Sequence, residues 1–110
     1  MTTKGAMMTD ALRQLLAALE AERQALAGMD VEALSLATTH KDALCASLAG
    51  APARPLTDEE RGLAETARAL NDLNRRTRNL LAAHTAARLD ALTGAAACYT
   101  LRRPADGSST

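Results

Sequence analysis

The sequence predicts an all-α protein made of long antiparallel helices, and two observations lead to that class. The 110 residues include 26 Ala and 18 Leu, which are strong helix formers, whereas Phe and Trp are absent and there is a single Tyr. The apolar residues recur at steps of three and four, which places them on one face of a helix. We therefore expect helices packed through Leu and Ala, with a thin core to which no large ring contributes.

The longest predicted helix covers residues 57–93 and organises the rest of the chain. Thr57 and Glu60 have the spacing of a capping box, and no proline interrupts the run before Gly94, which suits a C-cap. At about 1.5 Å per residue this helix is roughly 55 Å long. Its apolar stripe consists of Leu63, Ala67, Leu70, Leu73, Thr77, Leu80, Leu81, His84, Ala87 and Leu92. A rod of this length needs another helical surface along it.

Two shorter stripes precede this helix. The first contains Leu12, Leu15, Leu16, Leu19 and Leu26, and we expect Glu20, Glu22, Arg23 and Gln24 mostly on the opposite side. The second contains Val31, Leu34, Thr38, Lys41, Leu44, Cys45 and Leu48. Gly28 and Asp30 separate them and suit a C-cap and an N-cap. Pro52 and Pro55 exclude helix from the linker that follows.

The path of the chain at residues 28–30 has two solutions. A reversal there gives a three-helix bundle, and a kink gives one arm, residues 9–49, packed on the helix 57–93 as a long hairpin. Eighteen residues, five helical turns, separate Leu16 from Leu34, so the stripes stay in phase and favour the kinked arm. Left-handed coiled-coil-like packing is expected in both cases. We predict a disordered leader (1–8), one helical domain (9–94) and a flexible tail (95–110).

Composition narrows the function classes. Thirteen basic and thirteen acidic residues cancel, which argues against nucleic-acid and anionic-membrane partners. No apolar run is long enough for a membrane span and no signal peptide is recognisable, so a cytoplasmic location is expected. Cys45 and Cys98 lack metal-ligand spacing and are expected to be a buried thiol and a tail thiol.

No catalytic, metal or cofactor-binding constellation is recognisable, so an enzyme is not expected. His40 and His84 have no second ligand at helical spacing. His84 is either a stripe residue with a hydrogen-bonded edge, the favoured interpretation, or a pH-sensitive contact at a partner surface. The basic cluster of Arg75, Arg76 and Arg78 indicates a solvated face, with Asp72 as the i,i+4 partner of Arg76, more than a docking site.

Two sets of residues on the long helix each have two possible interpretations. Asn74 and Thr77 either set the register of a partner helix, as buried polar residues do in coiled coils, or lie solvated at the margin of the stripe. Leu80, Leu81, Leu89 and Leu92 are either core or an amphipathic surface left open for a client helix.

The chain resembles the FlgN family over about residues 10–107. The matching residues are Leu19-x-x-Glu22 with Leu26, then Lys41-Asp42-x-Leu44-x-x-x-Leu48, then Leu70-Asn71-x-Leu73-Asn74 running to Leu80-Leu81, and a Tyr-containing tail that ends in glycine and Ser/Thr. The chain departs from the family at Thr77, where another asparagine is usual. It also departs at Tyr99-Thr100-Leu101-Arg102-Arg103, which replaces a glycine-containing tyrosine motif.

The resemblance implies a small all-α chaperone of flagellar type III export. Such proteins bind hook-associated proteins, keep them unassembled and deliver them to the export apparatus, and client contact is attributed to their C-terminal helical region. The client-binding residues expected here are Leu80, Leu81, His84, Leu89, Leu92, Tyr99 and Leu101. The alternative is a structural coiled-coil adaptor whose stripes serve only self-association, and a homo-oligomer is an expectation in either case.

Overall fold

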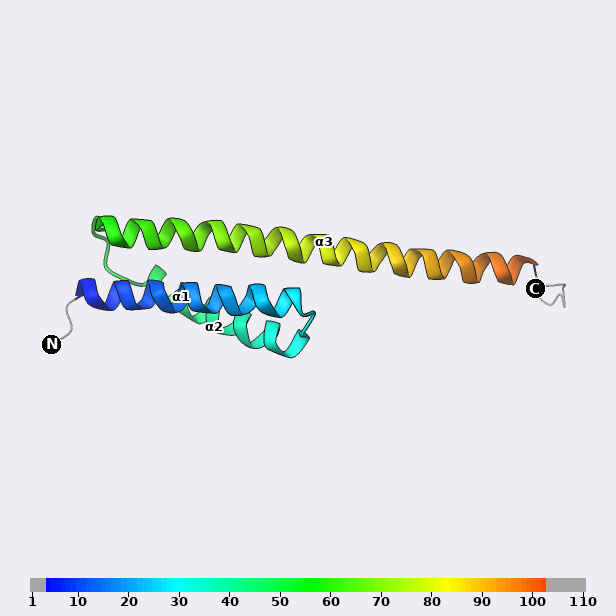
Figure 1. Cartoon of the computed structure of the whole chain (residues 1–110), viewed down its shortest axis with the longest axis horizontal. Coiled ribbons are helices and arrows are strands. Elements are labelled where there is room, and N and C mark those ends of the chain that lie inside the picture. Colours follow the sequence, from blue (N-terminus) through cyan, green and yellow to red (C-terminus); the bar gives the residue numbers. More distant parts are fainter. Residues whose placement is uncertain (1–3, 103–110) are drawn as a thin grey trace. The chain divides into compact units, whose positions relative to one another are not determined.

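Three α-helices make up the described part of the chain (Figure 1). The computed structural model describes the backbone of residues 4–102 and the side chains of residues 7–94. The helices are α1 (Lys4–Ala27), α2 (Val31–Ala49) and α3 (Asp58–Arg102), and the described residues include no strand. The predicted all-α class is confirmed. The chain divides into a unit of residues 1–77 and a unit of residues 78–110.

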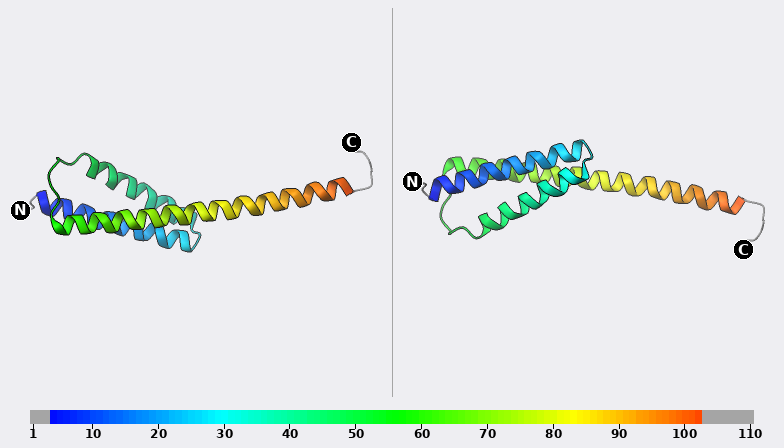
Figure 2. Two further views of the ribbon diagram at one scale, coloured as in Figure 1. Left: turned by 90° about the horizontal axis from the view of Figure 1, so that it is seen from above. Right: turned by 90° about the horizontal axis from the view of Figure 1, so that it is seen from below.

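The chain reverses between α1 and α2, so the favoured kinked arm is wrong and the three-helix alternative is correct. In both views of Figure 2, α2 runs back along α1, and the first part of α3 lies beside α1 in the same direction. Met29 has a left-handed backbone with φ of 53°. The N–H of Asp30 donates to Ala25 and the N–H of Met29 donates to Leu26, which is the Schellman pattern that ends a helix. The phase count failed because it presumes helical backbone between the stripes.

Two helix boundaries differ from the predicted ones. Helix α1 begins at Lys4, so residues 4–8 of the predicted leader are helical. Helix α3 continues through Gly94 to Arg102, so Gly94 is not a C-cap and residues 95–102 of the predicted tail are helical. An interior glycine costs only about 1 kcal/mol relative to alanine, and the three alanines that follow favour continuation. Residues 1–3 and 103–110 lie outside the described residues.

The start of α3 follows the sequence prediction. The N–H of Glu60 donates to Thr57 Oγ1 at 3.1 Å, and the N–H of Thr57 donates to Glu60 Oε1 at 2.9 Å, so the capping box is confirmed. The linker that contains Pro52 and Pro55 is not helical, as predicted. Asp30 accepts from the N–H of Ala33 at 3.0 Å and caps α2.

The core of the unit 1–77 is small and formed mainly by α1. Its buried apolar side chains are Leu12, Leu15, Ala18, Leu19, Ala25, Leu26, Ala37 and Ala67. Leu15 and Leu19 pack with Ala67 of α3, and half-buried leucines of all three helices surround them. Several predicted stripe positions are exposed instead, namely Val31, Cys45 and Leu73, so the expectation of a buried Cys45 thiol is wrong.

Candidate functional site

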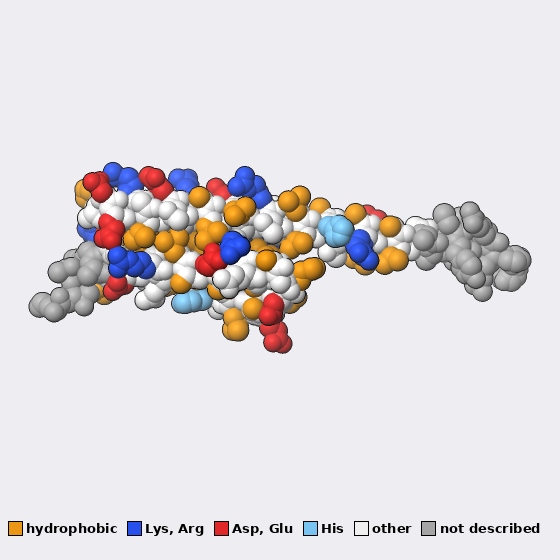
Figure 3. All heavy atoms as spheres, in the orientation of Figure 1, with side chains coloured by type: hydrophobic (Ala, Val, Ile, Leu, Met, Phe, Trp, Pro, Cys, Tyr) orange, Lys and Arg blue, Asp and Glu red, His pale blue; other side chains and the backbone are white. Residues whose placement is uncertain are grey.

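Leucine side chains are exposed along residues 78–94 of α3. Leu80, Leu89 and Leu92 expose 71%, 59% and 66% of their surface. His84 is exposed as well, and Leu81 is half-buried. In Figure 3 orange side chains lie open on the stretch of α3 that precedes the grey atoms. Five of the seven predicted client-binding residues are therefore on this stretch, while the side chains of Tyr99 and Leu101 lie outside the described residues.

The exposed leucines do not all share one face of the helix. Each residue turns an α-helix by about 100°, so Leu81 and Leu92, eleven residues apart, differ by about 20°. Leu89 lies about 80° from Leu81, whereas Leu80 lies about 100° away on the other side. We name Leu81, Leu89 and Leu92 the leucine stripe. It is the part of the predicted set that a single partner helix can cover.

Small residues surround the leucine stripe. Between its first and last leucine, Ala82, Ala83, Ala86, Ala87 and Ala91 are all exposed. Because alanine adds little bulk, a second helix can approach the backbone of this segment closely. The charged residues that interrupt the segment are Arg78, Arg88 and Asp90. An apolar stripe with short neighbours and few charges is typical of a helix-pairing surface.

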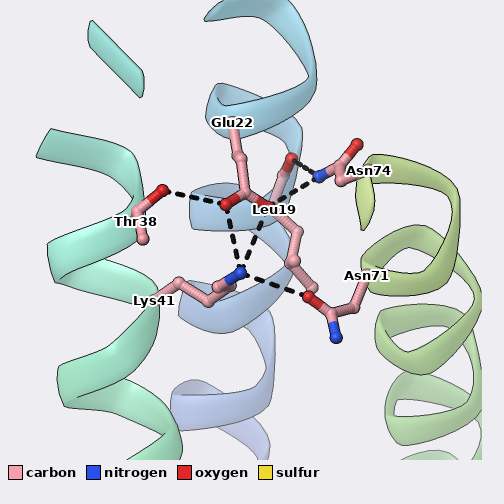
Figure 4. A network of polar contacts seen from close by, with 6 residues as sticks. All are labelled: Leu19, Glu22, Thr38, Lys41, Asn71 and Asn74. Carbon is pink, nitrogen blue, oxygen red and sulfur yellow. Dashed lines mark hydrogen bonds and ion pairs between the residues drawn. The ribbon is translucent and has the colours of Figure 1, made fainter. Parts of the chain in front are cut away.

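A second feature, inside the unit 1–77, is a buried polar network that joins all three helices. Figure 4 shows Glu22 of α1 between Thr38 and Lys41 of α2 and Asn74 of α3. Its carboxylate accepts from Thr38 Oγ1 at 3.0 Å, from Lys41 Nζ at 3.1 Å and from Asn74 Nδ2 at 2.9 Å. Glu22 is fully buried, so its predicted place on the polar side of α1 is wrong. We name Glu22, Thr38, Lys41 and Asn74 the polar network.

Asn74 is the member of the polar network that α3 supplies. Its side chain is 1% exposed, and Nδ2 also donates to the backbone oxygen of Leu19 at 2.9 Å. Its Oδ1 is buried and has no hydrogen-bond partner among the described residues. One turn earlier, the exposed Asn71 accepts from Lys41 Nζ at 3.2 Å. The solvated alternative for Asn74 is wrong: it is a buried polar residue that contacts a helix of its own chain, and Thr77 is half-buried.

The hydrogen bonds keep Glu22 ionised despite its burial. Burial acts to raise the pKa of the Glu22 carboxyl, but the bonds from Asn74, Lys41 and Thr38 outweigh it and the pKa is lowered. A buried charge without such donors is costly. The polar network is therefore charged at neutral pH. The removal of any donor leaves the buried charge of Glu22 with fewer hydrogen bonds to stabilise it.

Glu60 forms a separate buried acid site at the start of α3. Arg54 of the linker donates to both of its carboxylate oxygens, at 3.0 and 2.7 Å. The Arg54 guanidinium, followed by the backbone N–H of Thr57, lowers the pKa of Glu60 to about 2. This bidentate pair holds the linker against the first turn of α3. The sequence indicated the cap but not the arginine, because a loop residue six positions earlier has no periodic relation to the helix.

The remaining candidate residues lie at the surface, and Arg78 among them is half-buried. Arg75 lies 3.5 Å from Asp72, so the ion pair predicted for Arg76 forms instead at i,i+3. Arg76 and His40 are exposed. Among the described residues no group of three or more His, Cys, Asp or Glu could hold a metal ion.

The chain was compared with protein-family models, curated proteins and solved structures. None of these comparisons finds a match. None of the described helices combines the length and the hydropathy that crossing a membrane requires.

The polar network had a signal in the sequence. Leu15, Leu19, Glu22 and Leu26 follow one another at steps of four, three and four, so Glu22 occupies a stripe position. Lys41 lies on the predicted second stripe, with the opposite charge. Charged residues at stripe positions of two helices are thus a signal of a buried ion pair that the sequence prediction did not use.

Proposed function

We propose that this chain is a cytoplasmic export chaperone that binds hook-associated proteins, keeps them unassembled and delivers them to the flagellar type III export apparatus. The proposal joins the FlgN-family resemblance of the sequence to one observation, the exposed leucines of residues 78–94. A group of large apolar side chains on an exposed helix is more often a protein-interaction site than a surface without a binding function. The client would be a segment that becomes helical on the leucine stripe.

The energetics suit a partner that must later be released. Covering one exposed leucine contributes about 2 kcal/mol, so three leucines contribute roughly 6 kcal/mol. Ordering a disordered client segment offsets about 2–5 kcal/mol of that gain. Further contacts along the helix would add to the gain. The leucine stripe alone thus leaves a net gain of about 1–4 kcal/mol, equivalent to a dissociation constant of about 1 mM or weaker, so further contacts are needed to reach the moderate affinity that allows capture without irreversible binding.

The test is the binding of a purified hook-associated protein to Leu89→Asp, Leu92→Asp and the double variant. Both side chains are exposed, so the substitutions leave the helix intact, which circular dichroism verifies. Loss of one leucine contact of about 2 kcal/mol weakens binding roughly 30-fold, and the double variant binds below detection. Leu36→Asp is the matched control, because Leu36 is 73% exposed on α2, in the other unit.

The outcomes separate the chaperone from the self-associating adaptor. A chaperone shows client binding that the Leu89 and Leu92 variants lose and that Leu36→Asp retains. An adaptor shows a concentration-dependent mass in light scattering that the same two variants reduce to that of a monomer, without any client binding. Equal binding by the parent chain and the double variant would remove the leucine stripe from the function.

A further inference from the structure

The apolar surface of α3 that packs on α1 does little to fix the position of α3 along its own axis. Among the described side chains of α3, Ala67 is the one buried apolar residue, with Leu63, Ala64 and Leu70 half-buried beside it. Alanine side chains barely interlock, so sliding α3 by one turn exchanges one small apolar contact for another. Asn74 differs, because both hydrogen bonds of its Nδ2 end at fixed acceptors on α1.

A slide of α3 by three residues is penalised in either direction. If Asn71 took the place of Asn74, then Arg68 would take the place of Asn71, which accepts from Lys41, and two cations would meet. If Thr77 took the place of Asn74, its single hydroxyl donor could not serve both the Leu19 oxygen and Glu22. The present alignment is the only one of the three in which both sites are satisfied.

A slide by four residues fails for related reasons. In one direction Leu70 would face Glu22, and the buried carboxylate would lose a donor. In the other direction Arg75 would be placed beside Lys41, and the longer Arg78 side chain would have to enter the buried site that holds the much smaller Asn74. Polar contacts therefore distinguish alignments that the apolar contacts leave nearly equivalent.

We propose that the polar network selects the axial alignment of α3 on α1 and α2 without adding net stability. Buried charged pairs often contribute no more than apolar residues of the same volume would, because desolvation offsets their attraction. A single buried asparagine in a coiled coil fixes register in this way. Here the asparagine is joined by a charged pair from the other two helices, so one contact set aligns all three.

The test replaces the network by apolar residues in the full chain, with Glu22→Leu, Lys41→Met and Asn74→Leu combined. Spin labels at the exposed positions 24 and 65, which lie at well-separated heights along the parallel helices, report the axial alignment of α1 and α3, in a background with Cys45→Ser and Cys98→Ser. We expect an unchanged or higher thermal midpoint, and a distance distribution that gains a population displaced by about 5 Å, one helical turn.

The matched control removes the exposed ion pair between the same two helices, Arg13 and Glu59, whose atoms lie 2.8 Å apart. The Arg13→Gln, Glu59→Gln chain keeps the single distance of the parent. A single, undisplaced distance in the triple variant would overturn the proposal. A triple variant with a lower midpoint, or one that does not fold, would overturn it as well, because the network would then supply stability.

Discussion

Asn74→Ala tests how much one buried amide contributes when its partners stay in place. The substitution removes a hydrogen bond to the Glu22 carboxylate, worth about 1.5–3 kcal/mol, and one to the Leu19 oxygen, worth about 1 kcal/mol. It also removes the unpaired buried Oδ1, and this reduces the loss of stability by about 1 kcal/mol. Alanine further gains about 0.5 kcal/mol of helix propensity. The expected loss is about 2 kcal/mol of the free energy of unfolding.

The measurement is urea unfolding followed by circular dichroism, with Asn71→Ala as the control. Asn71 lies one turn earlier on α3, is exposed, and accepts one bond from Lys41. Because the propensity gain is the same at both positions, the difference between the two variants gives the buried contacts of Asn74 less the one exposed bond that Asn71 accepts. A difference below about 0.5 kcal/mol at equal m-value would refute the assignment of Asn74 as a structural contact.

Two further predictions concern the ends of helices. The pKa of Glu60 is lowered from 4.5 to about 2, so its pairing with Arg54 stabilises the fold above pH 4.5, and that stability is lost as the pH falls from 4.5 towards 2. In Glu60→Gln the thermal midpoint should therefore decline less across this interval than in the parent, and an identical decline would contradict the pairing. Met29→Gly removes a left-handed non-glycine residue, so urea unfolding should show a gain of up to about 1 kcal/mol, whereas a loss would mean that the Met29 side chain makes a stabilising contact.

Local rules were sufficient wherever the deciding groups are close in the sequence. The capping box at Thr57 and Glu60, the N-cap at Asp30 and the proline-containing linker involve residues within four positions of one another, and all are confirmed. The same reasoning failed at the α1–α2 turn. The left-handed residue there is Met29, one position after the glycine, and methionine carries no preference for that conformation.

Tertiary contacts explain the other differences. Glu22 has the spacing of a buried residue and the charge of an exposed one, and spacing prevails because Lys41 and Asn74 meet it from two other helices. Asn74 could be recognised as a register residue, but the helix that it contacts could not be identified before the chain reversal was known. The leucine stripe was recognisable as an apolar pattern, whereas its exposure depends on which part of α3 the other helices cover.

In a chain built from Ala and Leu, the polar network favours a single helix alignment, whereas the leucine stripe permits several. Tyr99 is the one aromatic residue of the sequence, so the apolar helix surfaces consist mainly of Ala and Leu, interlock little and permit several alignments. Inside the unit 1–77 such freedom would give several packed states, and the hydrogen bonds of Asn74 and Glu22 oppose it. On the exposed segment the same freedom would suit the proposed chaperone function, because a surface of leucines and alanines could accept client helices in more than one alignment. An asparagine introduced into the leucine stripe, which would set register as Asn74 does, should therefore reduce the number of different client helices that the proposed chaperone binds. It should not strengthen the binding.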